Sequence, residues 1–91
     1  MSSRVMQYSL QNTQDPQVIS MPVGATFISI GTQDLQMFMY FEIDDAEDQF
    51  ENRTFMIVGT AWELPPFRKY IGSVISNQFA MHVYEFQRGR E

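Results

Sequence analysis

The sequence predicts an all-β protein, a small antiparallel β-sandwich or barrel of six to seven short strands. Short runs of apolar and alternating residues are rich in the β-branched and aromatic side chains that strands favour. Turn-forming residues separate these runs at close intervals. No segment longer than one turn shows the 3.6-residue period of an amphipathic helix.

The size of the chain indicates one domain, residues 1–91, with residues 1–4 and 87–91 expected to fray. The composition is 44% hydrophobic and 14% aromatic, which is enough for a core because each aromatic side chain buries a large area. There is no cysteine, so disulfides, thiolate chemistry and cysteine zinc sites are excluded.

The net charge of −5 opposes binding to phosphate backbones, and general nucleic-acid binding is therefore not expected. No apolar stretch has the length of a signal peptide core or of a membrane span. We therefore expect a soluble protein of the cytoplasm that makes no membrane contact.

Three strands are predicted in the first third of the chain, at residues 5–10, 17–21 and 26–30. The polar segment 11–16 ends in Asp-Pro and favours a turn between the first two. Residues 22–25, Pro-Val-Gly-Ala, end the second strand because proline lacks a ladder donor and glycine permits a turn.

The longest predicted strand spans residues 35–43, after a hairpin connection at 31–34. Alternation places one set of side chains on the core face: Leu35, Met37, Met39, Phe41 and Ile43. The opposite face carries Gln36, Phe38, Tyr40 and Glu42. Because this second face is half aromatic, we expect another strand, a loop or a second subunit to cover it.

The last third is predicted to form three strands, at residues 53–60, 70–74 and 79–86. Both faces are apolar over 55–58, which indicates a strand in the middle of a sheet. Gly59 and Gly72 suggest bulges or close backbone approach. Asn77 and Gln78 form a short turn, and a brief helix in 44–52 or 65–69 would be compatible with the fold.

Several short motifs follow one another between Met21 and Glu85: Met-Pro-Val-Gly-Ala at 21–25, Arg-Thr-Phe-Met-Ile-Val-Gly-Thr at 53–60, Tyr-Ile-Gly-Ser-Val at 70–74 and Met-His-Val-Tyr-Glu at 81–85. In this order they resemble a family of small, uncharacterised, phage-encoded proteins. The family's Gly-Thr-Gly-His is Gly59-Thr60-Ala61-Trp62 here, and Met81 replaces its tryptophan before histidine. The resemblance implies a phage accessory protein made in the cytoplasm of an infected bacterium, and no particular activity.

The segment 61–70 is the first candidate binding site, for a protein partner or a ligand. It holds the sole tryptophan, a proline pair, further aromatic residues and two adjacent cations. Tryptophan, tyrosine and arginine are enriched in interface hot spots, and proline lowers the entropy lost on docking. The candidate residues are Trp62, Glu63, Phe67, Arg68, Lys69 and Tyr70. In the competing interpretation, Trp62 and Phe67 fold back and close one end of the core.

A second candidate is an acidic partner surface, which comprises Asp44, Asp45, Glu47, Asp48 and Glu51. Five carboxylates in nine residues could attract a cation or a basic protein, or mimic the phosphates of DNA. The run lacks the ligand spacing and central glycine of an EF-hand loop, so no metal site is predicted. A solvated loop is the simpler interpretation.

His82 is the only histidine, and we expect it to be a hydrogen-bonded structural residue at a sheet surface. Glu85 is three residues away and so on the opposite strand face. Met37, Met39, Met56 and Met81 are expected to fill the core. No nucleotide-binding, zinc or nucleophile–base motif is present, so no catalytic residue, metal or cofactor is predicted.

The preferred hypothesis is a non-enzymatic phage accessory protein that interferes with a host or anti-phage defence component through protein–protein contacts. We also expect a homo-oligomer, because two predicted strands are apolar on both faces. One alternative is an oligomeric sponge for a small signalling nucleotide, with Trp62 or Tyr70 stacking and Arg53, Arg68 and Lys69 on phosphates. Another is a minor virion or assembly protein.

Overall fold

Seven strands form the computed structural model, which describes residues 2–76 and 78–86. In chain order they are β1 (Ser3–Leu10), β2 (Gln17–Pro22), β3 (Thr26–Gln33), β4 (Gln36–Asp44), β5 (Phe50–Gly59), β6 (Arg68–Ser76) and β7 (Phe79–Phe86). The described residues contain no helix, and the two segments that could have held a brief one are turns, bends or extended chain. The all-β prediction is confirmed.

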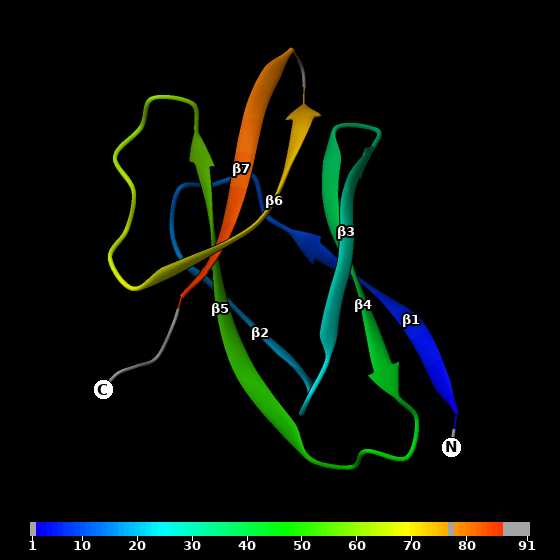
Figure 1. Ribbon diagram of the computed structural model, residues 1–91. Helices are drawn as coiled ribbons and strands as arrows, with labels where there is room; N and C mark the ends of the chain where they lie inside the picture. The colour runs from blue at the N-terminus through cyan, green and yellow to red at the C-terminus, as the bar shows by residue number, and fades with distance from the viewer. Residues whose placement is uncertain (1, 77, 87–91) are drawn as a thin grey trace.

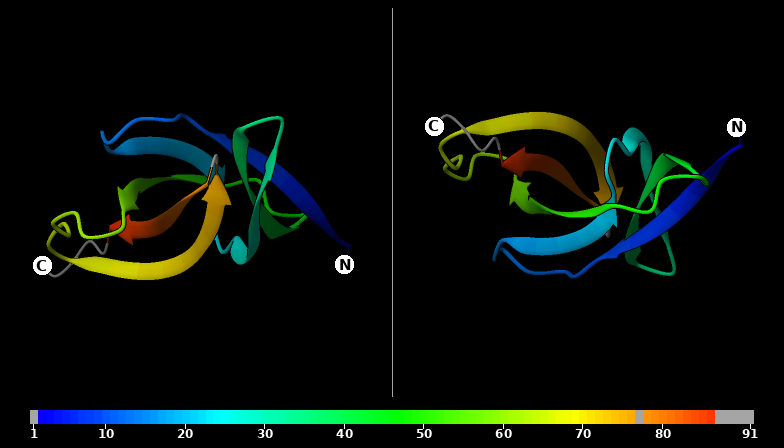
Figure 2. Two further views of the ribbon diagram at one scale, coloured as in Figure 1. Left: turned by 90° about the horizontal axis from the view of Figure 1, so that it is seen from above. Right: turned by 90° about the horizontal axis from the view of Figure 1, so that it is seen from below.

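The strands form two antiparallel sheets, one ordered β1-β4-β3 and the other β2-β5-β7-β6 (Figure 1). The sheets do not close into a barrel, so of the two predicted architectures the sandwich is the one observed. Edge strands β3 and β6 lie side by side, where the two sheets approach each other (Figures 1 and 2). β5 and β7 are the central strands of the larger sheet, as the apolar run of residues 55–58 predicts.

The core lies between the sheets and is built around Phe41 of β4, whose side chain is fully buried. Its ring makes edge-to-face contacts with Tyr8, Phe27 and Phe55, at centroid distances of 5.8, 5.6 and 6.0 Å. These partners come from β1, β3 and β5, so one ring joins three strands of both sheets. Aromatic rings favour this geometry, which adds to the stabilisation from burial.

Strand β4 shows the predicted alternation, because Met37, Met39 and Phe41 are buried. The prediction for Leu35 is wrong, since its side chain is 69% exposed. It lies with Asp34 in a two-residue turn between β3 and β4, where both residues have positive φ, 53° and 69°. A two-residue hairpin turn of this kind matches the twist of the strands, so turn geometry overrides the apolar alternation at this position.

Replacing Leu35 by glycine is expected to raise the free energy of unfolding by about 0.5–1 kcal/mol. Positive φ costs a residue with a Cβ atom roughly 1–2 kcal/mol, and the greater entropy of glycine in the unfolded chain offsets part of the relief. Urea unfolding of Leu35→Gly and of Leu35→Ala, which keeps the Cβ atom, measures the effect. A glycine variant no more stable than the alanine variant would contradict this account of the turn.

Two glycines occur where the chain needs them, as predicted. The register of β6 against β7 shifts between Tyr70 and Gly72, which marks a bulge. A Cβ atom on Gly72 would lie 3.1 Å from the Ile30 side chain of β3. A Cβ atom on Gly59 would lie 2.7 Å from the Trp62 ring. Both positions are therefore close approaches that only glycine fits without a shift of its neighbours.

The strands extend further than the sequence indicates. Ser3 and Arg4, expected to fray, are paired with Asp44 and Ile43 of β4, and β5 begins at Phe50 instead of residue 53. Asn77 and residues 87–91 lie outside the described residues, as does Met1. No helix among the described residues is long and apolar enough to cross a membrane.

Candidate functional site

The connection from β5 to β6 forms the largest loop of the larger sheet, and Figure 1 shows it projecting from one side of the molecule. Pro65 is buried and anchors it. The backbone N–H of Trp62 donates to the Gly59 carbonyl at 3.1 Å. The side-chain Nη1 of Arg68 donates to the Pro65 carbonyl at 3.2 Å. Local hydrogen bonds at both ends of the loop and the buried Pro65 therefore restrain its conformation.

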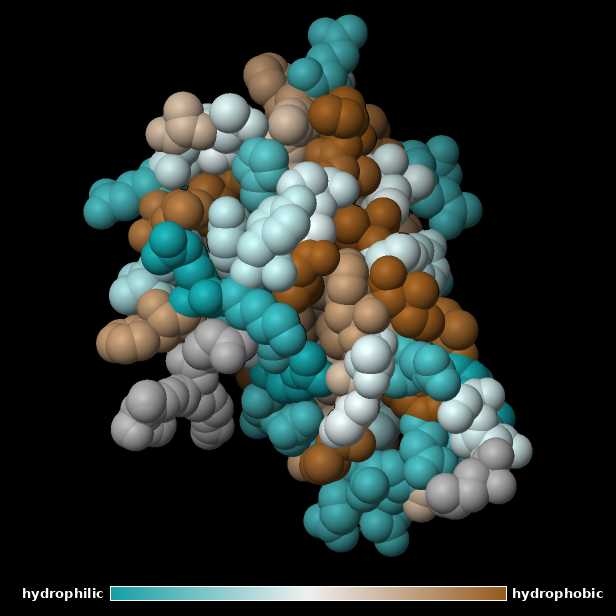
Figure 3. Space-filling model, viewed as in Figure 1, coloured by the Kyte–Doolittle hydropathy of each residue, from teal (hydrophilic) through white to brown (hydrophobic). Residues whose placement is uncertain are grey.

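Large apolar side chains of this loop remain in contact with solvent. The exposed fractions are 45% for Trp62, 39% for Leu64 and 72% for Phe67. Tyr70, 54% exposed, lies in strand β6 together with Arg68 and Lys69, so the candidate segment 61–70 includes the loop and the start of this strand. Phe67 therefore does not close the end of the core, and Trp62 does so only in part. Hydrophobic surface is also visible between polar regions on the face shown in Figure 3.

The Trp62 side chain lines two neighbouring hollows in the surface. One, of about 490 Å³, lies between Trp62 and the β7 residues Phe79 and Met81. Another, of about 440 Å³, is bounded by the segment Asn12–Asp15, which connects β1 to β2. The sequence gives no sign of this neighbourhood, because a tertiary contact between loops almost fifty residues apart leaves no local pattern.

Lys69 lies away from the tryptophan along the sheet. In the backbone register of the sheet, Lys69 of β6 lies opposite Glu85 of β7, and Glu85 lies opposite Phe55 of β5. Trp62 instead packs on Gly59. Phe55 and Gly59 are four residues apart, about 13 Å along the strand. Lys69 instead borders a wide hollow with Glu51, Arg53 and Glu85, whereas the hollows described beside Trp62 are lined by no cation.

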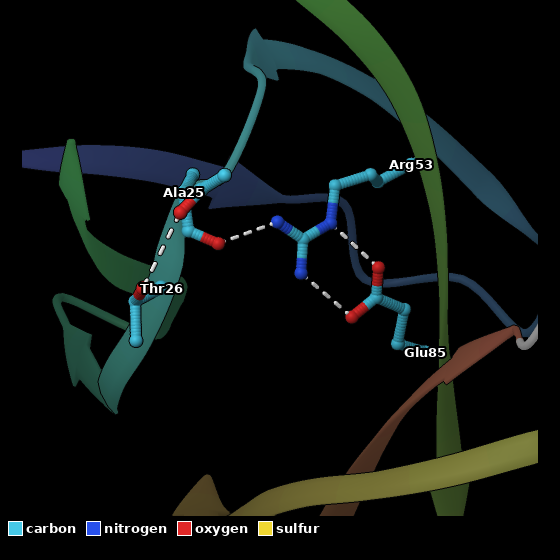
Figure 4. Close-up of polar contacts among 5 residues, drawn as sticks. Ala25, Thr26, Arg53 and Glu85 are labelled. Carbon is cyan, nitrogen blue, oxygen red and sulfur yellow. Dashed lines mark hydrogen bonds and ion pairs between the residues drawn. The ribbon is translucent and has the colours of Figure 1, made fainter. Parts of the chain in front are cut away.

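Arg53, expected to face phosphate in the nucleotide hypothesis, is already bound inside the sandwich (Figure 4). Its Nε and Nη2 donate to the two Glu85 carboxylate oxygens at 2.6 and 2.9 Å, and its Nη1 donates to the Ala25 carbonyl at 2.7 Å. The guanidinium carbon is 5.2 Å from the centre of the Phe41 ring. The hydrogen bonds that Arg53 donates to Glu85 raise the pKa of Arg53, while burial acts against this shift. Arg53 is therefore a structural cation.

The acidic segment is a loop whose carboxylates bind its own backbone and one neighbouring cation. Asp44 Oδ1 accepts from the Ala46 N–H, and Glu47 Oε2 accepts from the Gln49 N–H, both at 2.9 Å. Asp45 pairs with Arg4 at 2.6 Å. No three potential ligands among the described residues gather as a metal site would require.

The acidic segment and the 61–70 loop do not form one surface. The acidic loop precedes β5 and the other loop follows it, so the ten residues of β5 separate the two by roughly 30 Å. Figure 1 shows the two loops leaving opposite ends of this strand. A partner that contacts Trp62 need not reach the acidic loop.

His82 is half-buried on the outer face of the larger sheet, and both of its ring nitrogens are hydrogen-bonded. Nε2 is 2.9 Å from Thr60 Oγ1, and Nδ1 is 2.7 Å from Ser73 Oγ, which also bonds to the Tyr70 hydroxyl. His82 is therefore hydrogen-bonded at a sheet surface, as predicted. Glu85 is on the other face, as predicted, where it binds Arg53.

Sequence reasoning missed the Ser73–His82 pair, because the β6–β7 register that joins them includes a bulge. A serine hydroxyl beside a histidine can serve as a nucleophile when a third group orients the ring and donors receive the developing charge. Here the other ring nitrogen meets a threonine hydroxyl, and no carboxylate of the described residues bonds to the ring. The arrangement is a polar row from the residue that follows β5, through β7, to β6.

Comparisons with known proteins identify a family for the whole chain and no function. A family model described as a domain of unknown function matches residues 1–91. No curated protein and no solved structure matches the chain.

Proposed function

Since the chain belongs to the DUF7352 family, a domain of unknown function, we propose its function from its own surface and infer that it is a binding protein without enzymatic activity. The partner is a protein, and the 61–70 loop docks it. The observation that carries this proposal is the half-exposed Trp62 between two surface hollows, on a loop that is already fixed.

The physical reasons are burial and entropy. Trp62, Leu64, Phe67 and Tyr70 each keep more than a third of their surface in water, and a partner would bury that area. Interfaces concentrate their binding energy in a few large side chains that are bordered by pockets. Because the loop is held by Pro65 and by local hydrogen bonds, little entropy would be lost on docking.

The biological setting rests on the resemblance of the motifs to phage-encoded proteins. We propose that the protein is a phage accessory protein that acts in the cytoplasm of the infected bacterium. Its partner would be a host or anti-phage defence protein, whose activity the bound protein blocks.

The nucleotide sponge is the weaker alternative. The two hollows described beside Trp62 are lined by no cation, and Arg53 is already paired with Glu85. Nothing observed in the described residues favours a virion component over a free protein.

Substitution of Trp62 tests the docking site. Tagged protein is used to isolate its partner from bacterial lysate, and the purified partner is then titrated while the fluorescence of the sole tryptophan is followed. Docking should shift the emission to shorter wavelength, and Trp62→Ala should weaken binding at least about thirtyfold, the effect of a hot spot of 2 kcal/mol or more. Affinity for Trp62→Ala is measured by calorimetry.

A pair of glycine variants separates the position of the indole from general effects on the sheet. Gly59→Ala keeps Trp62 but displaces its ring, because the new Cβ atom would lie 2.7 Å from it. Gly31→Ala is the matched control, since nothing lies within 4 Å of its Cβ position. We expect the first variant to weaken binding and the second to leave it unchanged. Equal binding by wild type and Trp62→Ala would contradict the proposed docking site.

A further inference from the structure

The two sheets end in four edge strands, and three of these have features that oppose pairing with another chain. β3 and β6 each contain a bulge, and they lie against each other. β2 has only six residues and ends at Pro22, which has no N–H to donate. Bulges, short length, proline and coverage by a neighbour are the means by which proteins protect sheet edges.

Edge strand β1 has none of these features. It pairs with β4 at eight consecutive positions without a register shift, and it contains neither proline nor glycine. Its other edge faces no strand of the described chain, because the sheet order is β1-β4-β3. The regular backbone of β1 is therefore available for a further strand.

The side chains of β1 are also incompletely covered. Met6 lies opposite Phe41 and so on the core face, yet 36% of its side chain remains exposed. Val5, on the outer face, is 59% exposed. A strand added beside β1 would cover apolar side chains on both faces of the sheet.

We propose that β1 of a second copy of this chain pairs antiparallel with this edge, joining two three-stranded sheets into one of six strands, β3-β4-β1-β1-β4-β3. A twofold axis normal to the sheet keeps each side chain on the same face in both copies, so residues that lie opposite each other are both even-numbered or both odd-numbered. The axis therefore passes through one residue, which lies opposite itself in the other copy. Centres at Met6 or Gln7 pair nearly the whole strand. Arg4, the only charged residue of β1, then lies opposite Tyr8 or Leu10 of the other copy and never opposite itself.

A second copy suits this edge better than an unrelated strand, because the pairing is self-complementary in both registers. With the centre at Met6, the two Met6 side chains meet across the axis, and with the centre at Gln7, Met6 meets Tyr8. Either contact buries the exposed part of Met6. One pair of edge strands is a small interface, so we expect a reversible dimer with micromolar affinity.

Sedimentation of the purified protein, from about 1 µM to 1 mM, tests the dimer. Wild type is expected to pass from monomer to a dimer of twice the 10.6 kDa chain mass. The double variant Val5→Lys with Gln7→Lys places lysine opposite lysine in both registers, and it should weaken dimerisation at least about tenfold. Both positions are exposed, so the fold should be retained, which circular dichroism checks.

The matched control carries the same two charges on the other free edge. Val18→Lys with Ser20→Lys changes exposed positions of β2 and should leave the dimer intact. A protein that stays monomeric up to the highest concentration would overturn the proposal, as would a dimer that the β1 variant leaves unchanged. Because no residue of the 61–70 loop takes part, either result leaves the proposed docking site to be judged separately.

Discussion

Replacing Phe41 by alanine is expected to destabilise the fold by about 4 kcal/mol, the largest effect of any single truncation we predict. Its ring is fully buried, and it contacts the rings of Tyr8, Phe27 and Phe55 edge-to-face. Truncation of a buried phenylalanine costs roughly 3–5 kcal/mol, and loss of the aromatic pairs places this position in the upper part of that range.

Urea unfolding at equilibrium measures this loss, with Phe50→Ala as the matched control. Phe50 begins β5, but its side chain is 62% exposed, so the same substitution there should cost less than about 0.5 kcal/mol. A loss below about 2 kcal/mol for Phe41→Ala would contradict the placement of this ring at the centre of the core.

Replacing Glu85 by alanine is expected to cost about 2–3 kcal/mol. The side chains of Arg53 and Glu85 are only 19% and 13% exposed, and removal of the carboxylate leaves the guanidinium with the Ala25 carbonyl as its one remaining hydrogen-bond partner. An unpaired buried charge costs roughly 3–5 kcal/mol, and the remaining exposure of Arg53 lowers that figure.

Neutralisation of Arg53 cannot relieve this cost under ordinary conditions. In wild type, the hydrogen bonds that Arg53 donates to Glu85 raise the pKa of Arg53 in the folded state. Glu85→Ala removes this cause, and the guanidinium then stays charged because the ordinary pKa of arginine is already far above neutral. A raised folded-state pKa means that the contribution is fully present below the unfolded-state pKa and is lost only as the pH rises through the folded-state value. Arg53 therefore remains charged at neutral pH.

Replacement of both partners of the ion pair should avoid most of this loss of stability. Arg53→Met combined with Glu85→Leu replaces the ion pair by apolar side chains, and exchanges of this kind are often nearly neutral. We expect the double variant to unfold within about 1 kcal/mol of wild type, with a coupling energy that a double-mutant cycle reports. Additive losses in the two single variants would show that the pair contributes as two independent residues.

The sequence predicts most of the strands, because apolar alternation and turn residues are local signals. It fails at Leu35, where the apolar pattern continues but a two-residue turn with positive φ intervenes. It also misjudges Arg53, since nothing local shows that Glu85, 32 residues later in the chain, closes a bidentate pair with it. Contacts set by sheet packing cannot be read from spacing along the chain.

The candidate site follows the same division. The residue types of the 61–70 loop, a tryptophan with prolines and further aromatic residues, are visible in the sequence. The sequence does not show that the residues of this segment lie at different places on the surface. Trp62 borders the Asn12–Asp15 segment, whereas Lys69 borders the carboxylates of Glu51 and Glu85. The hydrogen-bonded row through His82 also depends on the register of three strands.

Native mass spectrometry of the protein purified gently from bacterial lysate tests the central claim most directly, namely that this is a protein-binding module whose contact surface is centred on Trp62. We expect wild type and Gly31→Ala to retain the same bacterial protein at fixed stoichiometry, and Trp62→Ala and Gly59→Ala to lose it. A small adduct with the mass of a nucleotide, in place of a protein, would contradict the claim. Retention of the same protein by Trp62→Ala would contradict it equally.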